Sequence, residues 1–560
     1  MTQIGEWMFS ARPPDILNTI SNLSSDEVFT PLKVVRPMLD GLAAAWADGN
    51  NGEDIWADES ATFLDPASKS GVFLREIVAR MVQAHEPYVD AGARQARVDH
   101  ILTKQVFGIG MTQITSLIAR RSVYCSKDAT GTHSIAKSFD RAWGNIWFER
   151  TEHTWTRGTP RRRVNPIGRD EELDYPTCQY CPANRQTYER GADLETHAYA
   201  FTHTDDPSEL IAKLYGAAMH FDVIIGNPPY QLGDSGGDAI GSFAMPIYQK
   251  FVQAAKALEP RYLTMITPSR WFAGGRNLDE YRAEMLSDRR VRQLVDYSDS
   301  RDVFPSSADI SGGVSYFLWD STYEGPCSVI NATARGMSEA MSRYLNEFDV
   351  VVRSNRAVSV LHKVDPAARE GNLSSRVSPI QPFSLRTDFR GNASSQGMKF
   401  PVVLYQRGGT AFIERKAIPR NHEWIDQWKV YLSAAASEHG GQADKNGLKK
   451  VFSRIIVAGP GTACTETYLV ANRFDSETAA QNFADYLRTR FVRFLVSLRT
   501  NTQHLYNDRF SFVPDLPMDR SWTDADLYAK YGLTEDEIIY IESVIKPIED
   551  TRPEAEDAED

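Results

Sequence analysis

Apolar runs and amphipathic segments alternate along the first 320 residues of the chain. Phe73, Ile77 and Met81 recur every four residues, a spacing that predicts the buried face of a helix. Similar patterns predict further helices over 112–124 and 243–258. Apolar segments that predict buried strands lie at 62–64, 102–110, 220–225, 261–266, 291–297 and 314–319. Alternating strands and helices predict a doubly wound α/β domain with a mostly parallel sheet and helices on both faces.

Three other regions depart from this alternation. Residues 126–205 are polar and read as an insertion within a first domain that spans 1–335. Residues 336–545 are irregular and rich in turns, which predicts a separate α+β domain. Two helices near its end are predicted by capping-box pairs, Thr523 with Asp526 and Thr534 with Glu537. Residues 546–560 form an acidic tail that we expect to be disordered.

Composition is that of an ordinary globular protein, with 42% hydrophobic and 24% charged residues. No apolar run is long enough to span a bilayer, and the N-terminus has no signal-peptide pattern. Five cysteines in 560 residues indicate a reducing compartment, so we expect a cytoplasmic protein without a membrane partner. The net charge of −12 does not exclude nucleic acid, because seven acidic residues lie in the last twelve positions.

The segment Asn-Pro-Pro-Tyr at 227–230 directly follows a predicted buried strand. The Asn227 side-chain oxygen and the Pro228 carbonyl could accept both hydrogens of an exocyclic amino group. Accepting them keeps the lone pair on nitrogen, which makes an aromatic amine nucleophilic. Pro229 stiffens the turn, and Tyr230 offers a ring on which a base can stack. The simpler interpretation is a stiff turn without chemistry.

A second segment, DPASKSG at 65–71, lies between a predicted strand and a predicted helix. Open α/β sheets bind ligands at the carboxyl ends of their strands, over helix N-termini. Asp65, the small Ala67 and Gly71 would let a ligand approach the backbone there. Taken alone, the segment is equally consistent with a tight strand–helix turn.

The order of FTP (29–31), DPASKSG and NPPY resembles that of N6-adenine DNA methyltransferases of restriction–modification systems. The segments at 267–275, 295–305 and 312–319 are also similar to that family. The resemblance implies a methyltransferase-type, Rossmann-like sheet followed by a C-terminal target-recognition domain. It also implies methyl transfer from S-adenosylmethionine to a flipped-out adenine of double-stranded DNA.

The resemblance also implies roles for individual residues. The catalytic set would be Asn227, Pro228, Pro229 and Tyr230. The cofactor set would be Phe29, Thr30 and Pro31 at the methionine end, with Asp65, Ala67 and Gly71 in the cofactor loop. Asp205, or the neighbouring Asp206, would contact the cofactor's adenine.

Two positions depart from the family pattern. Ser68-Lys69 stands where the family usually has Cys-Gly. If position 69 required positive φ, a lysine there would cost roughly 1 kcal/mol or more. Gly110 stands where the family usually has an acidic residue for the ribose hydroxyls, so ribose contacts are expected from elsewhere.

Cys178 and Cys181 have the spacing of zinc ligands, but they form the single such pair in the sequence. The further ligands of a structural zinc would come from Cys125, His133, His153, His197 or His203. The alternative is two ordinary thiols.

Two basic stretches are candidates for contacts with DNA phosphates. One is RGTPRRRV at 157–164, which is equally typical of a solvated loop. The other is 482–513, where arginines alternate with aromatic residues. In that stretch the alternative interpretation is an amphipathic helix with Phe491, Phe494 and Leu495 in the core. Both interpretations can apply, to opposite faces of the helix.

Other functions remain open at this point. An NPPY motif also occurs in methyltransferases that act on RNA or on protein glutamine, and N4 of cytosine is a chemically similar amine. A non-catalytic DNA-binding specificity subunit is a further alternative. Because the FTP motif lies close to the first residue, we expect any restriction endonuclease partner to be a separate protein.

Overall fold

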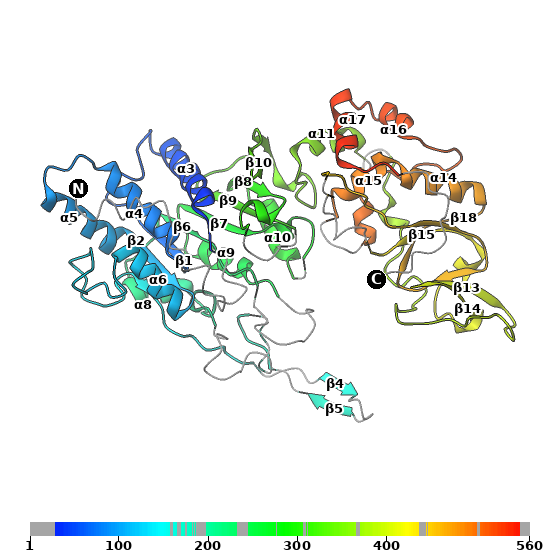
Figure 1. Ribbon diagram of the computed structural model, residues 1–560, viewed down its shortest axis with the longest axis horizontal. Helices are drawn as coiled ribbons and strands as arrows, with labels where there is room; N and C mark the ends of the chain where they lie inside the picture. Colours follow the sequence, from blue (N-terminus) through cyan, green and yellow to red (C-terminus); the bar gives the residue numbers. More distant parts are fainter. Residues whose placement is uncertain are drawn as a thin grey trace. The chain divides into compact units, whose positions relative to one another are not determined.

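The computed structural model describes residues 29–548 with internal gaps (Figure 1). The gaps are 157–160, 165–169, 174–175, 182, 184, 186–197, 232–244, 276, 306–309, 311, 366–369, 436–443, 445 and 501–504. The predicted disordered tail therefore lies almost entirely outside the described residues. The chain divides into two compact units, Met1–Asp349 and Val350–Asp560. The sequence placed this boundary at 335/336, before the short strands that close the first unit.

The first unit is built on a 10-stranded sheet with the order β11-β10-β8-β9-β7-β6-β1-β2-β3, and β12 pairs with β10. Its strands are β1 (Phe63–Ser68), β2 (Val106–Gly110), β3 (Ile146–Trp147), β6 (Val223–Gly226), β7 (Tyr262–Pro268), β8 (Val291–Tyr297), β9 (Val314–Asp320), β10 (Cys327–Thr333), β11 (Gly336–Met337) and β12 (Met341–Arg343). Strand β9 is antiparallel to both of its neighbours, β7 and β8. The predicted doubly wound, methyltransferase-type sheet is confirmed, with this one antiparallel strand inside its parallel core.

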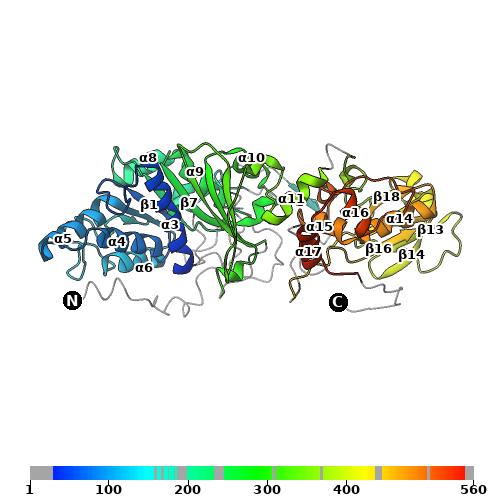
Figure 2. The same ribbon diagram turned by 90° about the horizontal axis from the view of Figure 1, so that it is seen from above.

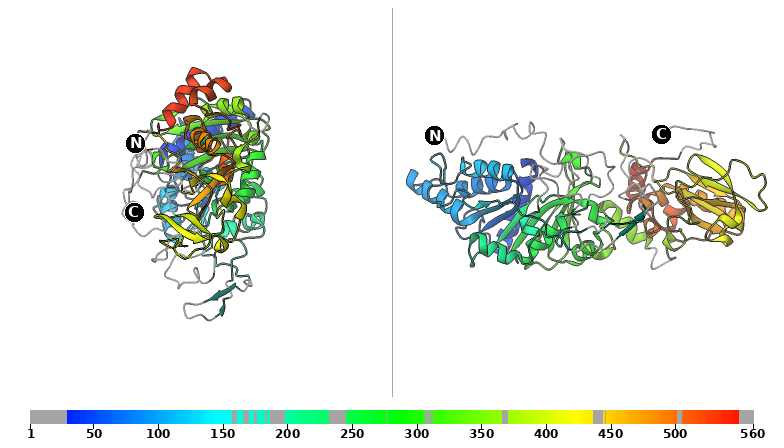
Figure 3. Two further views of the ribbon diagram at one scale, coloured as in Figure 1. Left: turned by 90° about the vertical axis from the view of Figure 1, so that its right-hand side faces the viewer. Right: turned by 90° about the horizontal axis from the view of Figure 1, so that it is seen from below.

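Helices cover both faces of the sheet (Figure 2). The helices are α3 (Leu32–Gly49), α4 (Val72–Ala84), α5 (Ala91–His100), α6 (Gln113–Tyr124), α8 (Pro207–Tyr215), α9 (Tyr248–Ala257) and α10 (Asp279–Ser287). Helices α3, α4 and α6 lie on one face and α8, α9 and α10 on the other, as the view from below also shows (Figure 3). The predicted face of α4 is confirmed, because Phe73, Ile77 and Met81 are at most 2% exposed. Burying each such side chain stabilises the fold by about 1.5–3 kcal/mol.

The region assigned to an insertion contains one strand of the main sheet. Strand β3 pairs with β2 at the sheet edge, and a two-residue strand has no periodicity that a sequence could reveal. A hairpin of β4 (Arg161–Val164) and β5 (Asp170–Leu173) follows. Its register places Arg162 opposite Glu172 and Arg163 opposite Glu171, so the basic stretch is the first strand of this hairpin.

The second unit has two three-stranded sheets, β14-β13-β17 and β16-β15-β18, and is therefore α+β as predicted. Its strands are β13 (Pro401–Gln406), β14 (Gly409–Glu414), β15 (Trp428–Ser433), β16 (Ile455–Ala458), β17 (Thr462–Cys464) and β18 (Tyr468–Phe474). Its helices are α11 (Asn355–Val364), α14 (Glu477–Arg488), α15 (Arg490–Ser497), α16 (Asp524–Lys530) and α17 (Glu535–Val544). Both predicted capping boxes are formed, at the start of α16 and of α17.

Helix α15 lies within the 482–513 stretch and shows where Arg493 and its apolar neighbours lie. Phe491, Phe494 and Leu495 are fully buried, as the core interpretation predicted. Arg493 is also buried, and its guanidinium donates to the backbone oxygens of Arg488, Thr489 and Lys546. Arg493 therefore binds backbone carbonyls inside the unit, and the core interpretation is confirmed for this part of the stretch.

Within the described residues, no helix combines the length and the apolar character needed to cross a bilayer.

Candidate active site

The two central motifs leave the sheet side by side. Strands β1 and β6 are adjacent and parallel, with Phe63 opposite Val223 and Leu64 opposite Ile224. From this pair the chain winds outward in both directions, to β2 and β3 on one side and to β7 on the other. Such a switch point opens a crevice at the carboxyl ends of the strands. DPASKSG ends β1 there, and NPPY follows β6 at the same edge.

A narrow pocket at this edge collects residues from all three motifs. Of the predicted cofactor residues it is lined by Phe29, Thr30, Asp65, Ala67 and Gly71, and Asn227 joins them from the catalytic motif. The FTP segment is linked directly to NPPY, because the Asn227 side-chain nitrogen donates to the Thr30 hydroxyl at 3.0 Å. In this arrangement the Asn227 oxygen is the end of the amide that can accept from a substrate amine. Pro31 caps α3 next to Thr30 and does not line the pocket.

Asp65 is buried at the base of this pocket, with 2% of its surface exposed. Its carboxylate accepts a hydrogen bond from the Ala67 backbone nitrogen at 3.1 Å. Burial raises the pKa of Asp65 to about 7, against the lowering effects of that hydrogen bond and of the Lys69 charge. A methyl group on Gly226 would lie 2.8 Å from the Asp65 carboxylate, so the glycine before Asn227 makes room for this acid.

Gly71 performs the turn from β1 into α4. It is the N-cap of α4 with φ of +70°, and a side chain there would lie 3.0 Å from the Ala119 Cα atom of α6. Lys69 is not among the described residues with positive φ. The steric cost considered for a lysine at this position therefore does not arise, because the left-handed residue of the loop is Gly71.

The remaining NPPY residues are also buried. Pro228, Pro229 and Tyr230 continue from β6, and the Tyr230 carbonyl accepts from the Ile247 nitrogen at 3.2 Å. The Tyr230 side chain is 8% exposed and belongs to the main hydrophobic core. Burial raises the pKa of its phenol, which keeps it neutral. A base that stacks on this ring must displace part of what covers it.

Close packing explains why no acid stands at position 110. A side-chain carbon on Gly110 would lie 2.5 Å from the Cβ atom of Ser116 in α6 and 3.3 Å from that of Phe148. An acidic side chain therefore has no room. Phe148 follows β3 at the same edge of the sheet. Its packing against position 110 could not be predicted, because a two-residue strand leaves no signal in the sequence.

Asp205 lies elsewhere. It is exposed, does not line the pocket, and accepts from the Gln179 side chain at 3.4 Å. Asp206 caps the N-terminus of α8 by accepting from the Ser208 nitrogen. The structure therefore places both residues beside the Cys-x-x-Cys segment and not with the other predicted cofactor residues.

That segment belongs to a buried cluster of His153, Cys178, Cys181 and His203, whose potential ligand atoms all lie within 4.8 Å of one another. Of the candidate partners of the cysteine pair, the structure thus brings in His153 and His203. Cys125 and His133 are not part of the cluster, and His197 lies outside the described residues. A hydrogen bond from Cys181, supported by others from His153 and His203, holds the pKa of the Cys178 thiol well below its ordinary value.

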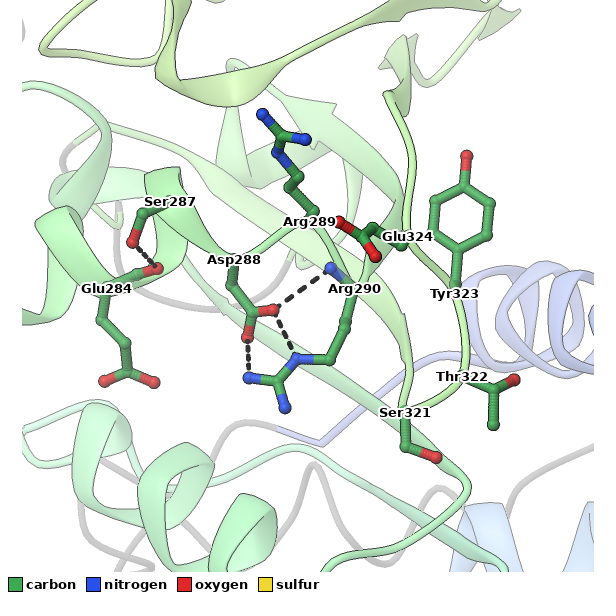
Figure 4. A pocket seen from close by; sticks show the side chains of 9 residues that line it. All are labelled: Glu284, Ser287, Asp288, Arg289, Arg290, Ser321, Thr322, Tyr323 and Glu324. Carbon is green, nitrogen blue, oxygen red and sulfur yellow. Dashed lines mark hydrogen bonds and ion pairs between the residues drawn. The ribbon is translucent and has the colours of Figure 1, made fainter.

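A larger pocket of about 510 Å³ lies at the opposite edge of the sheet, where β8 begins and β9 ends (Figure 4). Its central carboxylate, Asp288, accepts from the Arg290 guanidinium at 2.7 Å, from the Trp319 ring nitrogen at 2.9 Å and from Lys256 at 2.9 Å. The Asp288 carboxylate is thus neutralised by Arg290 and Lys256. None of the three motifs reaches this pocket. The candidate active site is therefore the switch-point edge.

Comparison with known proteins bears on the family of the chain. The chain is 31% identical over 369 residues to an "uncharacterized adenine-specific methylase" of Mycoplasma pneumoniae, and the match covers 63% of the chain and 82% of that relative. The chain belongs to the adenine-specific methylase family. Residues 104–304 of this methylase also match the Eco57I restriction-modification methylase family. The resemblance carried by the three motifs is thereby confirmed.

Two solved structures of proteins in complex with DNA also align with the methylase. The Type IIL enzyme MmeI in complex with DNA is 12% identical, with a TM-score of 0.44 and coverage of 86% of the chain. The DrdV–DNA complex is 11% identical, with a TM-score of 0.41 and coverage of 87% of the chain. The methylase spans 66% of the MmeI chain and 56% of the DrdV chain.

Proposed function

We propose that the protein is a site-specific DNA methyltransferase that methylates N6 of adenine, as the modification component of a restriction–modification or related defence system. The observation that carries the proposal is the meeting of FTP, DPASKSG and NPPY in one pocket at the switch point of the sheet. Membership of the adenine-specific methylase family supports the choice of base.

The residues at this edge suit S-adenosylmethionine, which supplies an activated methyl group on a sulfonium. The fit rests on the pocket's polar groups, since the buried Asp65 can accept from the ammonium of the methionine end. Phe29, Thr30, Ala67 and Gly71 would line the cofactor beside it.

NPPY acts on the target amine in this proposal. The adenine leaves the duplex, because a stacked base cannot reach an atom at the foot of a crevice. The Asn227 oxygen and the Pro228 carbonyl would accept the two N6 hydrogens and hold the lone pair toward the methyl group. The N6–carbon bond would form as the sulfonium–methyl bond breaks, and one N6 proton would pass to solvent. Thr30 orients the amide for this task through its 3.0 Å hydrogen bond. Tyr230 would stack on the extruded base, and the second unit would read the target sequence.

The proposal is tested by supplying labelled methyl donor with unmethylated double-stranded DNA, RNA or protein as acceptor. Label is expected in the DNA alone. Label in RNA or protein alone would favour the alternative methyltransferases with the same motif. Binding of the cofactor and DNA without transfer to any acceptor would favour a non-catalytic specificity subunit.

We further propose that any cognate restriction endonuclease is a separate protein. Within the described part of the chain, the cluster of His153, Cys178, Cys181 and His203 is the sole grouping suited to a metal ion, and it contains no carboxylate. Carboxylates are the ligands that Mg²⁺ prefers. We expect DNA to stay intact when it is incubated with the purified protein, its cofactor and Mg²⁺, and cleavage on an agarose gel would contradict this.

The Cys/His cluster is proposed to hold a structural zinc ion. Two thiolates and two imidazoles form a typical closed tetrahedral zinc site. The His203 Nδ1 atom is 2.9 Å from the Tyr199 backbone oxygen, an arrangement that turns Nε2 toward the metal as in known zinc sites. Because the ligands come from three separated segments, the ion would tie the segments before and after the β4–β5 hairpin to each other.

The zinc proposal predicts about one equivalent of zinc per purified chain, measured by inductively coupled plasma mass spectrometry. Cys178→Ser is expected to lose the metal and to lower the unfolding temperature, because an open tetrahedral set binds zinc far more weakly. Cys125→Ser is the matched control, since this half-buried thiol lies outside the cluster. Equal zinc content in the two variants would show that the cluster is two ordinary thiols with two histidines.

A further inference from the structure

Lys69, the residue that departs most from the family pattern, lies inside the candidate cofactor pocket. It is 6% exposed, although lysine is among the residue types that are rarely buried without a charged partner. It lines the same pocket as Asp65, Thr30 and Asn227. A buried ammonium at this place requires an anion to balance it.

In a pocket without a charged ligand, the Asp65 carboxylate alone would neutralise the Lys69 ammonium. The two side chains interact, since the Lys69 charge opposes the effect of burial on Asp65. However, Asp65 and Lys69 are the one acid and the one base among the described residues that line the pocket. One buried carboxylate and one buried ammonium are complementary to a zwitterion.

The methionine end of S-adenosylmethionine is such a zwitterion, with an α-ammonium and an α-carboxylate on one carbon. We propose that Lys69 binds the α-carboxylate of the cofactor while Asp65 binds its α-ammonium. Lys69 is then a residue that determines cofactor specificity. Lysine in place of the family's glycine adds a contact with the cofactor and does not disturb the loop. The inference rests on the proposed use of S-adenosylmethionine.

The pairing of Lys69 with Asp65 also explains how the pocket keeps two opposite charges buried when no ligand is bound. Lys69 and Asp65 balance each other in the free protein, and each exchanges its partner for the opposite charge of the ligand on binding. The net charge of the pocket is unchanged by this exchange, so the zwitterion binds without burying an unpaired charge.

The test is isothermal titration calorimetry of the full chain with S-adenosylmethionine and with its decarboxylated form, which lacks the α-carboxylate. Wild-type protein is expected to bind S-adenosylmethionine about 10- to 100-fold more tightly than the decarboxylated form, the range of a charge-assisted hydrogen bond. Lys69→Met is expected to bind the two ligands alike, through loss of affinity for S-adenosylmethionine alone. Lys69→Arg keeps the charge and is expected to retain most of the preference.

The inference is overturned if Lys69→Met weakens both ligands by the same factor, because Lys69 would then act solely through Asp65. It is equally overturned if the preference persists in Lys69→Met. Unfolding temperatures of both variants, compared with wild type, establish that the proteins titrated are folded, and Lys69→Arg provides the comparison should Lys69→Met fail to fold. Failure of the wild-type protein to bind either ligand would refute the proposed function itself, which distinguishes the two outcomes.

Discussion

Replacing Asn227 by alanine is expected to lower kcat for DNA methylation by about 10²- to 10³-fold, the cost of removing one preorganised polar group from a reaction centre. The amide oxygen would no longer accept from N6, so the amine lone pair would remain delocalised into the ring. The variant should remain folded and able to bind DNA, although it loses the hydrogen bond to Thr30 among its contacts in the free protein. Initial rates of methyl transfer at saturating cofactor and DNA measure the effect.

Two matched variants separate chemistry from packing at this position. Asn227→Asp keeps an accepting oxygen, and the Thr30 hydroxyl can turn to donate to it, so this variant should retain more activity than Asn227→Ala. Thr30→Val removes the hydroxyl that orients the amide and should cost about tenfold, the scale of one hydrogen bond. Equal activity of Asn227→Ala and wild type would show that the NPPY motif takes no part in the reaction.

Asp65→Asn is expected to weaken cofactor binding by about 100-fold, because a carboxylate–ammonium contact becomes a neutral one. The same change should make the stability of the ligand-free variant, relative to wild type, depend on pH. Burial raises the Asp65 pKa to about 7, above its unfolded value near 3.9, so the folded state holds this proton more tightly. The wild-type protein therefore loses stability as pH rises from about 4 to 7, by at most about 4 kcal/mol from this group.

Unfolding temperatures of wild type and Asp65→Asn at pH 5 and pH 8 measure this linkage. The unfolding temperature of the variant minus that of wild type should be higher at pH 8 than at pH 5, because Asp65 is ionised at pH 8 in the folded wild-type protein. Asparagine can still accept from the Ala67 nitrogen, so the local turn is retained. A difference between the two proteins that does not change with pH would show that Asp65 is not the buried, pH-sensitive group described here.

The central architecture and the principal motifs could be predicted from the sequence because they are local. The strand before NPPY and the helix after DPASKSG have strong hydrophobic patterns. The glycine that the sharp strand–helix turn requires is the last residue of DPASKSG. The meeting of both motifs follows from topology, since β1 and β6 are neighbours at the switch point.

Features that depend on long-range packing could not be predicted. The histidines that complete the Cys/His cluster are 25 residues before Cys178 and 22 residues after Cys181, and the sequence offered five candidates for the two places. The antiparallel β9 is a hydrophobic strand like its neighbours, and strand direction leaves no mark on composition. Asp205 was assigned from its position before a strand, but the turn into α8 directs it to the Cys-x-x-Cys segment.

Lys69 illustrates how a departure from a pattern can be misread. In the sequence it appeared where a glycine was expected, which suggested strain. The structure assigns the left-handed conformation to Gly71 and places Lys69 in the pocket opposite Asp65. A single sequence cannot distinguish a residue that disturbs a loop from one that adds a contact, because the difference lies in which loop position carries positive φ.

The measurement that tests the central claim most directly is mass spectrometry of nucleosides from DNA treated with the purified protein and S-adenosylmethionine. The DNA should come from a host without adenine methylation, and Asn227→Ala should be treated in parallel. We predict N6-methyldeoxyadenosine in the wild-type sample and little or none in the Asn227→Ala sample. Methylation confined to cytosine, or equal N6-methyldeoxyadenosine in both samples, would contradict the account.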